Sequence, residues 1–408
     1  MKYIIVGASI AGLWAARKIK SVKPKEEIIA LSKENVKPYG KMVLPYILFK
    51  EMTADSFYLD VPEGTKLLLE KEVVKVDTEN KFVTTNSGEK FKYDKLLIST
   101  GAHAYIPDVP GSNLPSVFSV RNLGDVQKIN EKIEQSAEKR VILSGAGLVN
   151  TEIGDALLKI DVPITYVVHS NRLLSQIIDE KASEIIEKEL SKSEVEILKG
   201  ESIKEIEEKN NTTYVKLESG KVLKGSCVVF GKGVKPNIDF LKGSKIKTNK
   251  GIIVNEHLET NIKDVYAAGD VAETRDVVYN DRRMHALWPI AVEHGKIAGL
   301  NMAGARISYE GDVSRNILTV LGKTIFTGGI SKEDKFNVYK KTTNGEYSKI
   351  ILKEGKLTGF LFTGEVNNPG VYLYIMKNEI EVDKLKKPLL YGTISYSDLH
   401  SSTRKRTF

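Results

Sequence analysis

The hydrophobic pattern of the first residues changes its period within a few positions. Residues 3–6 form a short, mostly β-branched apolar run, residues 7–12 (GASIAG) are small, and apolar residues recur at helical spacing from Leu13 onward. This order predicts a strand, a tight turn and a helix. In a dinucleotide site of this kind a glycine allows the tight turn, and the helix N-terminus faces the phosphates. Ser9 replaces the second glycine of the usual pattern, so an ordinary strand–turn–helix connection stays open as the alternative.

A second copy of this pattern lies in the middle of the chain. There the sequence KRVILSGAGLVNTE predicts a strand over residues 141–143, a turn at Gly145 and Gly147, and a helix to about Lys159. Asn150 stands at the third glycine position, which predicts slightly looser helix packing without loss of binding. Two such units in one chain indicate two dinucleotide sites.

The remaining apolar runs extend both units and add a third region. Pro107, Pro110 and Gly111 mark a linker before the second unit. Roughly the last hundred residues contain hairpin-like strands around Glu354 and Gly355, which suggests a small α+β domain. The other predicted elements are strands at 27–31, 72–77, 81–84, 92–99, 164–168 and 265–268, a β-rich part at 195–229, and helices at 179–192 and from Pro289 onward.

Composition sets the broad class. A length of 408 residues predicts two or three domains, and 41% hydrophobic with 28% charged residues is typical of a soluble globular protein. No apolar run approaches the ~18 residues of a membrane span, and glycines and Ser9 interrupt the apolar N-terminus, so a cytoplasmic location is expected. The net charge of +8 permits an acidic partner or a solvated Lys/Glu-rich surface, including the tail at 404–406, and no nucleic-acid-binding motif accompanies it.

Cysteine and histidine usage narrows the chemistry. The single cysteine, Cys227, lies in the apolar run SCVVFG, where a buried and inert thiol is expected. One cysteine cannot form a redox-active dithiol within the chain. The six histidines are scattered and form no Cys/His cluster in the sequence, so no metal site is predicted.

Four motifs in a fixed order carry a family resemblance. They are GASIAG (7–12), LLISTGA (96–102), GAGLVNTE (145–152) and VYAAGD (265–270). Over its whole length the chain resembles the FAD-dependent pyridine nucleotide-disulfide oxidoreductase superfamily. The segments PYGKMVLPY (38–46) and LWPIAVEHGKIAGLNMAG (287–304) are most similar to the NADH:rubredoxin reductase branch, which shares features with the flavin module of assimilatory nitrite reductases.

The resemblance implies an α/β fold with two Rossmann-like domains, as in glutathione reductase, and a small α+β C-terminal domain. It places a discontinuous FAD-binding domain at 1–110 and 245–309, an inserted NAD(P)H-binding domain at 111–244, and the C-terminal domain at 310–408. The implied FAD-binding residues are Gly7, Ser9, Ile10, Ala11, Gly12, Ser32, Lys33, Lys41, Val73, Thr100, Gly101, Ala102, Gly269, Asp270 and Trp288. The implied NAD(P)H-binding residues are Gly145, Gly147, Leu148, Val149, Asn150, Glu152, His169, Arg172, Gly231 and Gly233.

Several of these residues have specific implied roles. Asp270 would accept a hydrogen bond from the ribityl chain, and the helix after Pro289 would point its N-terminus at the flavin pyrimidine ring. Lys41 and Glu152 are the candidate catalytic residues, expected to approach the flavin and each other and to tune its potential; the alternative is two surface charges. Ser32 stands where a ribose-binding acid is usual, and Glu34 could still reach the ribose.

The nucleotide preference stays open between NADH and NADPH. His169 replaces the acid that would bind the NADH ribose, which removes repulsion against a 2′-phosphate, and His169 with Arg172 could bind one. Arg172 also occurs in relatives that use NADH.

The resemblance implies hydride transfer from NAD(P)H to FAD, followed by release of electrons. Disulfide reductases of the superfamily carry a Cys-containing motif after the first helix. Coenzyme A disulfide reductases and water-forming NADH oxidases have a single cysteine in the region that here reads KMVLPYILFK, which has none. Electrons are therefore expected to pass directly to a rubredoxin, a ferredoxin or another acceptor. The alternatives are an FAD electron-transfer subunit of a larger iron–sulfur complex and a flavoprotein kept for binding or signalling. The C-terminal domain forms dimers in only some relatives, which leaves a homodimer open.

Overall fold

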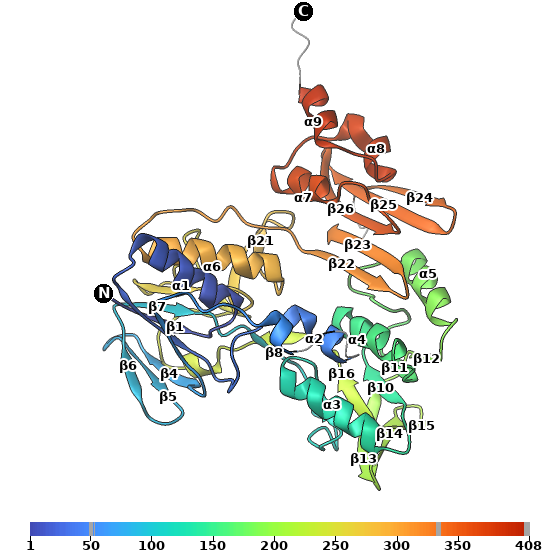
Figure 1. Ribbon diagram of the computed structural model, residues 1–408. Coiled ribbons are helices and arrows are strands. Elements are labelled where there is room, and N and C mark those ends of the chain that lie inside the picture. The colour runs from blue at the N-terminus through green and yellow to red at the C-terminus, as the bar shows by residue number, and fades with distance from the viewer. Residues whose placement is uncertain (49–51, 53, 332–335, 404–408) are drawn as a thin grey trace, which may run out of the picture.

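Three main sheets organise the chain (Figure 1). The computed structural model describes residues 1–48, 52, 54–331 and 336–403. Within these ranges two five-stranded sheets are parallel, and a third five-stranded sheet near the C-terminus is antiparallel. The tail at 404–406, expected to be solvated, and the end of the segment KMVLPYILFK (49–50) lie outside the described residues.

The first parallel sheet contains, in chain order, β1 (Lys2–Val6), β2 (Glu27–Leu31), β3 (Thr65–Leu68), β7 (Lys95–Ile98) and β19 (Val265–Ala267). Its spatial order is β19-β7-β1-β2-β3, and Ile4 on β1 lies between Ile29 and Leu96. Val265 pairs with Leu96, so a segment from beyond the second glycine turn completes the first sheet. The expected return of the chain to the first unit is therefore present.

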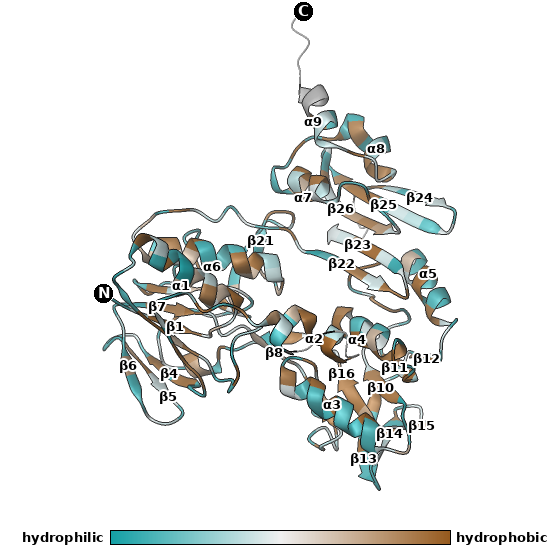
Figure 2. Cartoon of the chain, viewed as in Figure 1, coloured by the Kyte–Doolittle hydropathy of each residue, from teal (hydrophilic) through white to brown (hydrophobic). Residues whose placement is uncertain are grey.

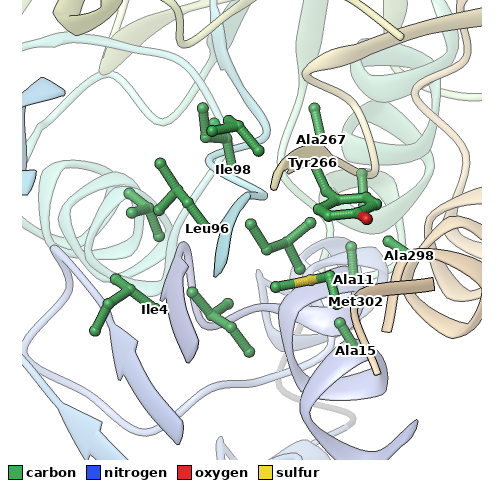
Figure 3. Close-up of a cluster of buried hydrophobic side chains, with 14 of the residues drawn as sticks. Ile4, Ala11, Ala15, Leu96, Ile98, Tyr266, Ala267, Ala298 and Met302 are labelled. Atoms are coloured by element: carbon green, nitrogen blue, oxygen red, sulfur yellow. The ribbon is translucent and has the colours of Figure 1, made fainter. Parts of the chain in front are cut away.

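Two helices cross above this sheet at very short range. These are α1 (Ile10–Val22) and α6 (Trp288–Met302), which lie side by side in Figure 1. A Cβ on Gly295 would lie 2.3 Å from Ala11 O, and one on Gly299 would lie 2.5 Å from Ala15 O. Figure 3 shows Ala11, Ala15 and Met302 in the buried cluster beneath the crossing. The first turn of α1 is thus held by a helix from far along the chain.

The second parallel sheet contains β9 (Val117–Phe118), β10 (Val141–Ser144), β11 (Ile164–Val168), β12 (Val195–Lys199) and β16 (Cys227–Phe230). Its spatial order is β12-β11-β10-β16-β9. Figure 2 shows hydrophobic residues along β10 and β16, as expected for strands covered on both faces. The associated helices are α3 (Leu123–Gln135), α4 (Leu148–Leu158) and α5 (Glu180–Leu190).

The C-terminal region is an antiparallel sheet with short helices. Its strands are ordered β22-β23-β26-β25-β24. The side chains of Phe326, Phe360, Phe362 and Tyr372 form its aromatic core, with Phe326 and Phe360 centroids 4.5 Å apart. The elements are β22 (Arg315–Val320), β23 (Lys323–Gly329), β24 (Asn337–Thr343), β25 (Glu346–Lys353), β26 (Lys356–Thr363), α7 (Pro369–Lys377), α8 (Lys386–Leu390) and α9 (Tyr396–Thr403).

A buried ion pair joins this region to the second parallel-sheet unit. Lys349 is 1% exposed, and its Nζ lies 2.8 Å from Asp179 Oδ2. The Tyr347 hydroxyl donates a hydrogen bond of 2.8 Å to the same carboxylate, and Leu321 N donates one of 2.8 Å to Asp155. These contacts fix the C-terminal sheet against α4 and α5.

Short elements connect and cover the three sheets. The remaining helical turns are η1 (Lys41–Val43), α2 (Leu44–Leu48), η2 (Ala54–Phe57), η3 (Asp239–Leu241) and η4 (Asp383–Leu385). The remaining strands are β4 (Val73–Asp77), β5 (Phe82–Thr85), β6 (Lys90–Lys92), β8 (Ala102–Ala104), β13 (Ile203–Lys209), β14 (Thr212–Leu217), β15 (Val222–Gly225), β17 (Val234–Pro236), β18 (Ile252–Ile253), β20 (Ala272–Asp276) and β21 (Asp281–Met284).

The predicted fold class is confirmed: the chain is an α/β protein with two Rossmann-like sheets and a C-terminal antiparallel sheet. The predicted helix near Pro289 begins at Trp288. The exact domain boundaries at 110, 244 and 309 stay a prediction. Among the described helices, none is long and apolar enough to cross a membrane.

The crossing of α1 and α6 gives a stability prediction. We expect Gly295→Ala to lower the free energy of unfolding by about 1–3 kcal/mol, because its Cβ meets the backbone of Ala11, although Ala is the better helix former. Gly370→Ala in α7 is the matched control, since a Cβ there meets nothing within 4 Å. Urea denaturation of both variants checks this. A Gly295→Ala protein as stable as the Gly370→Ala protein would contradict the proposed constraint.

Candidate functional site

The first glycine turn lies against the end of a neighbouring strand. Gly7 has φ +103°, and a Cβ there would lie 2.2 Å from Ser99 O; one on Gly12 would lie 2.2 Å from Gly7 O. Ser9 is the N-cap of α1, but its side chain makes no capping hydrogen bond, and the first turn of α1 contains no acidic residue. The helix N-terminus therefore keeps its positive potential and its free amides, which fits a pyrophosphate.

Six of the other residues predicted around FAD follow strands of the first sheet at the same edge, whereas Lys41 lies in η1 and Trp288 begins α6. Carboxyl ends of parallel strands share an edge, and ligands bind there. Ser32 and Lys33 follow β2, Thr100 and Gly101 follow β7, and Gly269 and Asp270 follow β19; Val73 begins β4 in a separate sheet. Ala102, the first residue of β8, continues directly from Thr100 and Gly101.

Hydrogen bonds hold the two loops of this edge in place. The Thr100 hydroxyl donates to Asn237 O at 2.9 Å, and Asn237 Nδ2 donates to Thr100 O at 2.8 Å. The Gly269 N–H donates to Nδ1 of the buried His294 at 3.2 Å. Burial lowers the pKa of His294 to about 3, so this imidazole is neutral and Nδ1 can accept.

Asp270 has a partner that the sequence did not suggest. Arg121 Nη2 lies 2.6 Å from Asp270 Oδ2, and Arg121 Nε donates to Ala102 O at 3.0 Å. Arg121 precedes the Asn122 cap of α3, so the pair joins the first site to the second unit. No motif around Arg121 could have indicated this contact, because the two residues are distant in the sequence. The second carboxylate oxygen of Asp270 can still accept from a ribityl hydroxyl.

Lys41 pairs with Glu34. Lys41 Nζ lies 2.6 Å from Glu34 Oε1, and the Tyr39 hydroxyl donates to Glu34 Oε2 at 2.8 Å. Among the described residues no hydrogen bond or ion pair joins Lys41 to Glu152, and their approach to the flavin and to each other stays a prediction. Glu34, considered for the ribose, offers both of its carboxylate oxygens to Tyr39 and Lys41.

Trp288 lies close to the Lys41 segment. A Cβ on Gly40 would lie 3.8 Å from Trp288 Cη2. Trp288 begins α6, whose N-terminus has Pro289 in the first turn, no acidic residue there and no side-chain cap. This helix end therefore presents free amides and positive potential, and its Trp288 ring lies near Gly40.

The second glycine turn repeats the first. Gly145 has φ +95°, and a Cβ there would lie 2.7 Å from Gly231 O. Gly147 is the N-cap of α4, the helix that carries the predicted residues Leu148, Val149, Asn150 and Glu152. Gly231 and Gly233 follow β16 at the same edge of the second sheet.

The looser packing predicted for Asn150 is not observed. Asn150 is fully buried, and its Nδ2 lies 2.9 Å from Gly145 O, 3.1 Å from Ser144 O and 3.2 Å from Val229 O. A Cβ on Gly231 would lie 2.3 Å from Asn150 Cγ. The Asn150 side chain thus packs directly against Gly231, and its hydrogen bonds connect the turn at Gly145 to β16.

The two residues considered for a 2′-phosphate have different neighbours. His169 follows β11, and its Nδ1 lies 3.1 Å from Ser202 Oγ. Arg172 Nη2 donates to Ser175 O at 3.1 Å, while its Nε is buried without a hydrogen-bond partner. Neither the His169 nor the Arg172 side chain forms an ion pair with a described carboxylate. Both side chains therefore stay available to a nucleotide.

Cys227 is confirmed as a buried thiol. It lies in the core strand β16 and is 0% exposed, and burial raises its pKa to about 12. The reactive form of cysteine is the thiolate, which this environment disfavours. Among the described residues no group of His, Cys, Asp and Glu side chains is arranged to hold a metal ion.

These features define the class: two dinucleotide-binding turns, one completed by a returning strand, in an α/β oxidoreductase fold. The chain belongs to the pyridine nucleotide-disulphide oxidoreductase family, whose model matches residues 1–295. Its members are NAD(P)H-dependent oxidoreductases that bind FAD.

Two relatives and one solved structure show the similarity in more detail. The chain is 29% identical to the NADH-rubredoxin oxidoreductase of Clostridium acetobutylicum, over 90% of this chain and 92% of that protein. The crystal structure of NADH:rubredoxin oxidoreductase from that organism matches with a TM-score of 0.79 and 28% identity, over 94% of this chain and 97% of the other. The chain is also 28% identical to the NADH-dependent phenylglyoxylate dehydrogenase subunit epsilon of Aromatoleum evansii, over 94% and 93% of the two chains.

Glu152 gives a pH prediction. Burial, with repulsion from Asp155, raises the pKa of Glu152 from 4.5 to about 7. The contribution of the protonated Glu152 carboxyl to the free energy of unfolding is fully present below pH 4.5, its ordinary pKa. This contribution is lost as the pH rises through about 7. We therefore expect the unfolding free energy of the wild type to fall relative to that of Glu152→Gln as the pH is raised through this window.

Urea denaturation at pH values on either side of that window measures the effect. Glu63→Gln is the control, because Glu63 is exposed and its replacement should shift stability equally at both pH values. Parallel pH dependence of the wild type and the Glu152→Gln protein would show that the carboxyl of Glu152 titrates normally.

Proposed function

We propose that this chain passes a hydride from NADH or NADPH to bound FAD and then passes electrons singly to a rubredoxin- or ferredoxin-like carrier. The observation that carries the proposal has two parts: the chain has two dinucleotide-binding turns, and its single cysteine is buried and cannot form a redox-active pair. The only cysteine of the sequence is buried in β16, on the opposite unit from the first turn. Electrons therefore have no protein disulfide through which to leave.

The residues at the first site fit FAD. Gly7 and Gly12 leave no room for a side chain at the two ends of this turn, and the N-terminus of α1 offers amides to a pyrophosphate. Asp270 would bind the ribityl chain while Arg121 holds its other oxygen. FAD supplies the chemistry that accepts a hydride and releases single electrons.

Other residues would position and tune the reaction. The N-terminus of α6, which begins at Trp288, offers free amides and positive potential that would stabilise negative charge on a reduced flavin. Lys41, paired with Glu34, would approach the flavin from the segment whose Gly40 lies near Trp288. Glu152, with a pKa of about 7, can hold or release a proton at its carboxyl oxygens near neutral pH. The amides at the start of α4 would bind the pyrophosphate of the nicotinamide nucleotide.

The similarity to a rubredoxin reductase supports this acceptor class. The net charge of +8 also suits an acidic iron–sulfur protein, because opposite charges speed association. A second candidate, an FAD subunit that delivers electrons within an iron–sulfur complex, is supported by the full-length similarity to the phenylglyoxylate dehydrogenase subunit.

Anaerobic reduction tests the proposal. The purified FAD-loaded protein is mixed with NADH or NADPH and then with oxidised rubredoxin or ferredoxin. We expect the flavin absorbance to be lost with at least one nucleotide and to return when the carrier is added. Cys227→Ala should behave like the wild type, since the thiol is not used.

Two results would contradict the proposal. If neither nucleotide reduces the flavin, the chain is not a reductase of this kind. If Cys227→Ala still accepts the hydride but no longer reduces the carrier, the electrons pass through the thiol. Fast flavin reduction without transfer to any free carrier, together with co-purification of iron–sulfur subunits, would favour the second candidate.

A further inference from the structure

Lys232 lies beside the second glycine turn. It follows β16 between Gly231 and Gly233, whose backbones are fixed by hydrogen bonds from Gly231 N to Ser144 O (2.9 Å) and from Tyr105 N to Gly233 O (2.9 Å). A Cβ on Gly145 would lie 3.4 Å from Lys232 Cδ. The stem of the lysine therefore packs against the turn that faces the pyrophosphate.

The ammonium group of Lys232 has no counterion in the structure. The side chain is half-buried, and no ion pair or hydrogen bond joins it to any described residue. Burial alone lowers the pKa of Lys232, with no carboxylate raising it. The first turn of α4 contains no acidic residue either. A lysine kept half-buried without a carboxylate is a site prepared for an anion from outside the chain.

The strand order shows which part of a nucleotide would meet this lysine. In the order β12-β11-β10-β16 the adenosine half of a dinucleotide would lie over the β11 side and the nicotinamide half over the β16 side, with the pyrophosphate at the start of α4 between them. Lys232 extends from the β16 side toward Gly145. We propose that the Lys232 ammonium binds the pyrophosphate of NAD(P)H from the nicotinamide side.

This inference rests on the proposed function, because it assumes a nicotinamide nucleotide in the second site. It adds a cationic ligand that the glycine pattern does not contain. Helix amides and one charged donor would then share the two negative charges of the pyrophosphate. A position over the nicotinamide ring is the competing geometry, and it would instead repel the positive ring of NAD⁺.

Calorimetric titration with ADP-ribose, which has the adenosine and pyrophosphate but no nicotinamide, tests the contact. We expect Lys232→Met to weaken ADP-ribose binding by on the order of tenfold, as for loss of a charge-assisted hydrogen bond. Lys235→Met is the matched control: Lys235 is exposed, its Nζ lies 4.0 Å from the Tyr105 ring centroid, and its loss should leave ADP-ribose binding unchanged. Lys232→Arg should retain most of the affinity, and the same titrations with NAD⁺ complete the set.

Each outcome decides the matter. Three results would overturn the pyrophosphate contact. Lys232→Met could bind ADP-ribose as tightly as the wild type, both Met variants could lose the same affinity, or Lys232→Met could bind NAD⁺ more tightly. If the wild type binds neither ADP-ribose nor NAD⁺, NADH or NADPH, the proposed function itself fails, and the inference fails with it. If Lys232→Met does not fold with FAD, Lys232→Gln replaces it under the same criteria.

Discussion

Each nucleotide turn of this protein depends on a backbone contact that leaves no room for a side chain. Gly7 lies against Ser99 O in the first unit, and Gly145 lies against Gly231 O in the second. Both contacts occur where a strand ends beside the turn, so the turn, the strand end and the helix N-terminus form one rigid edge. The rest of the fold supports these two edges, through the α1–α6 crossing in one unit and the Asn150 hydrogen bonds in the other.

The sequence predicted the parts that follow from local pattern. The two glycine turns and the helix beginning at Trp288 have signals within a few residues, whereas the return of β19 to the first sheet was expected only from the family resemblance. The pairing of Arg121 with Asp270 and of Lys41 with Glu34 had no such signal. These contacts depend on side-chain directions and on segments brought together only by the folded chain, so periodicity and spacing do not contain them.

The chemistry of the site follows from what surrounds the two turns. The N-terminus of α1 lies at the edge where FAD would bind, Lys41 and Arg121 are each paired with a carboxylate, and the only cysteine is in the core of the other unit. A neutral His294 satisfies the buried N–H of Gly269 and holds the loop that carries Asp270. Under the proposed function, a flavin at this site would give up its electrons directly, without a thiol relay.

The most direct measurement is the number of nicotinamide equivalents that reduce the protein fully under anaerobic conditions. The account predicts one equivalent of NADH or NADPH for each bound FAD, because the flavin is the only group that takes up a pair of electrons. Two equivalents per FAD would contradict it, since a second redox group in the protein would then have to accept the other pair.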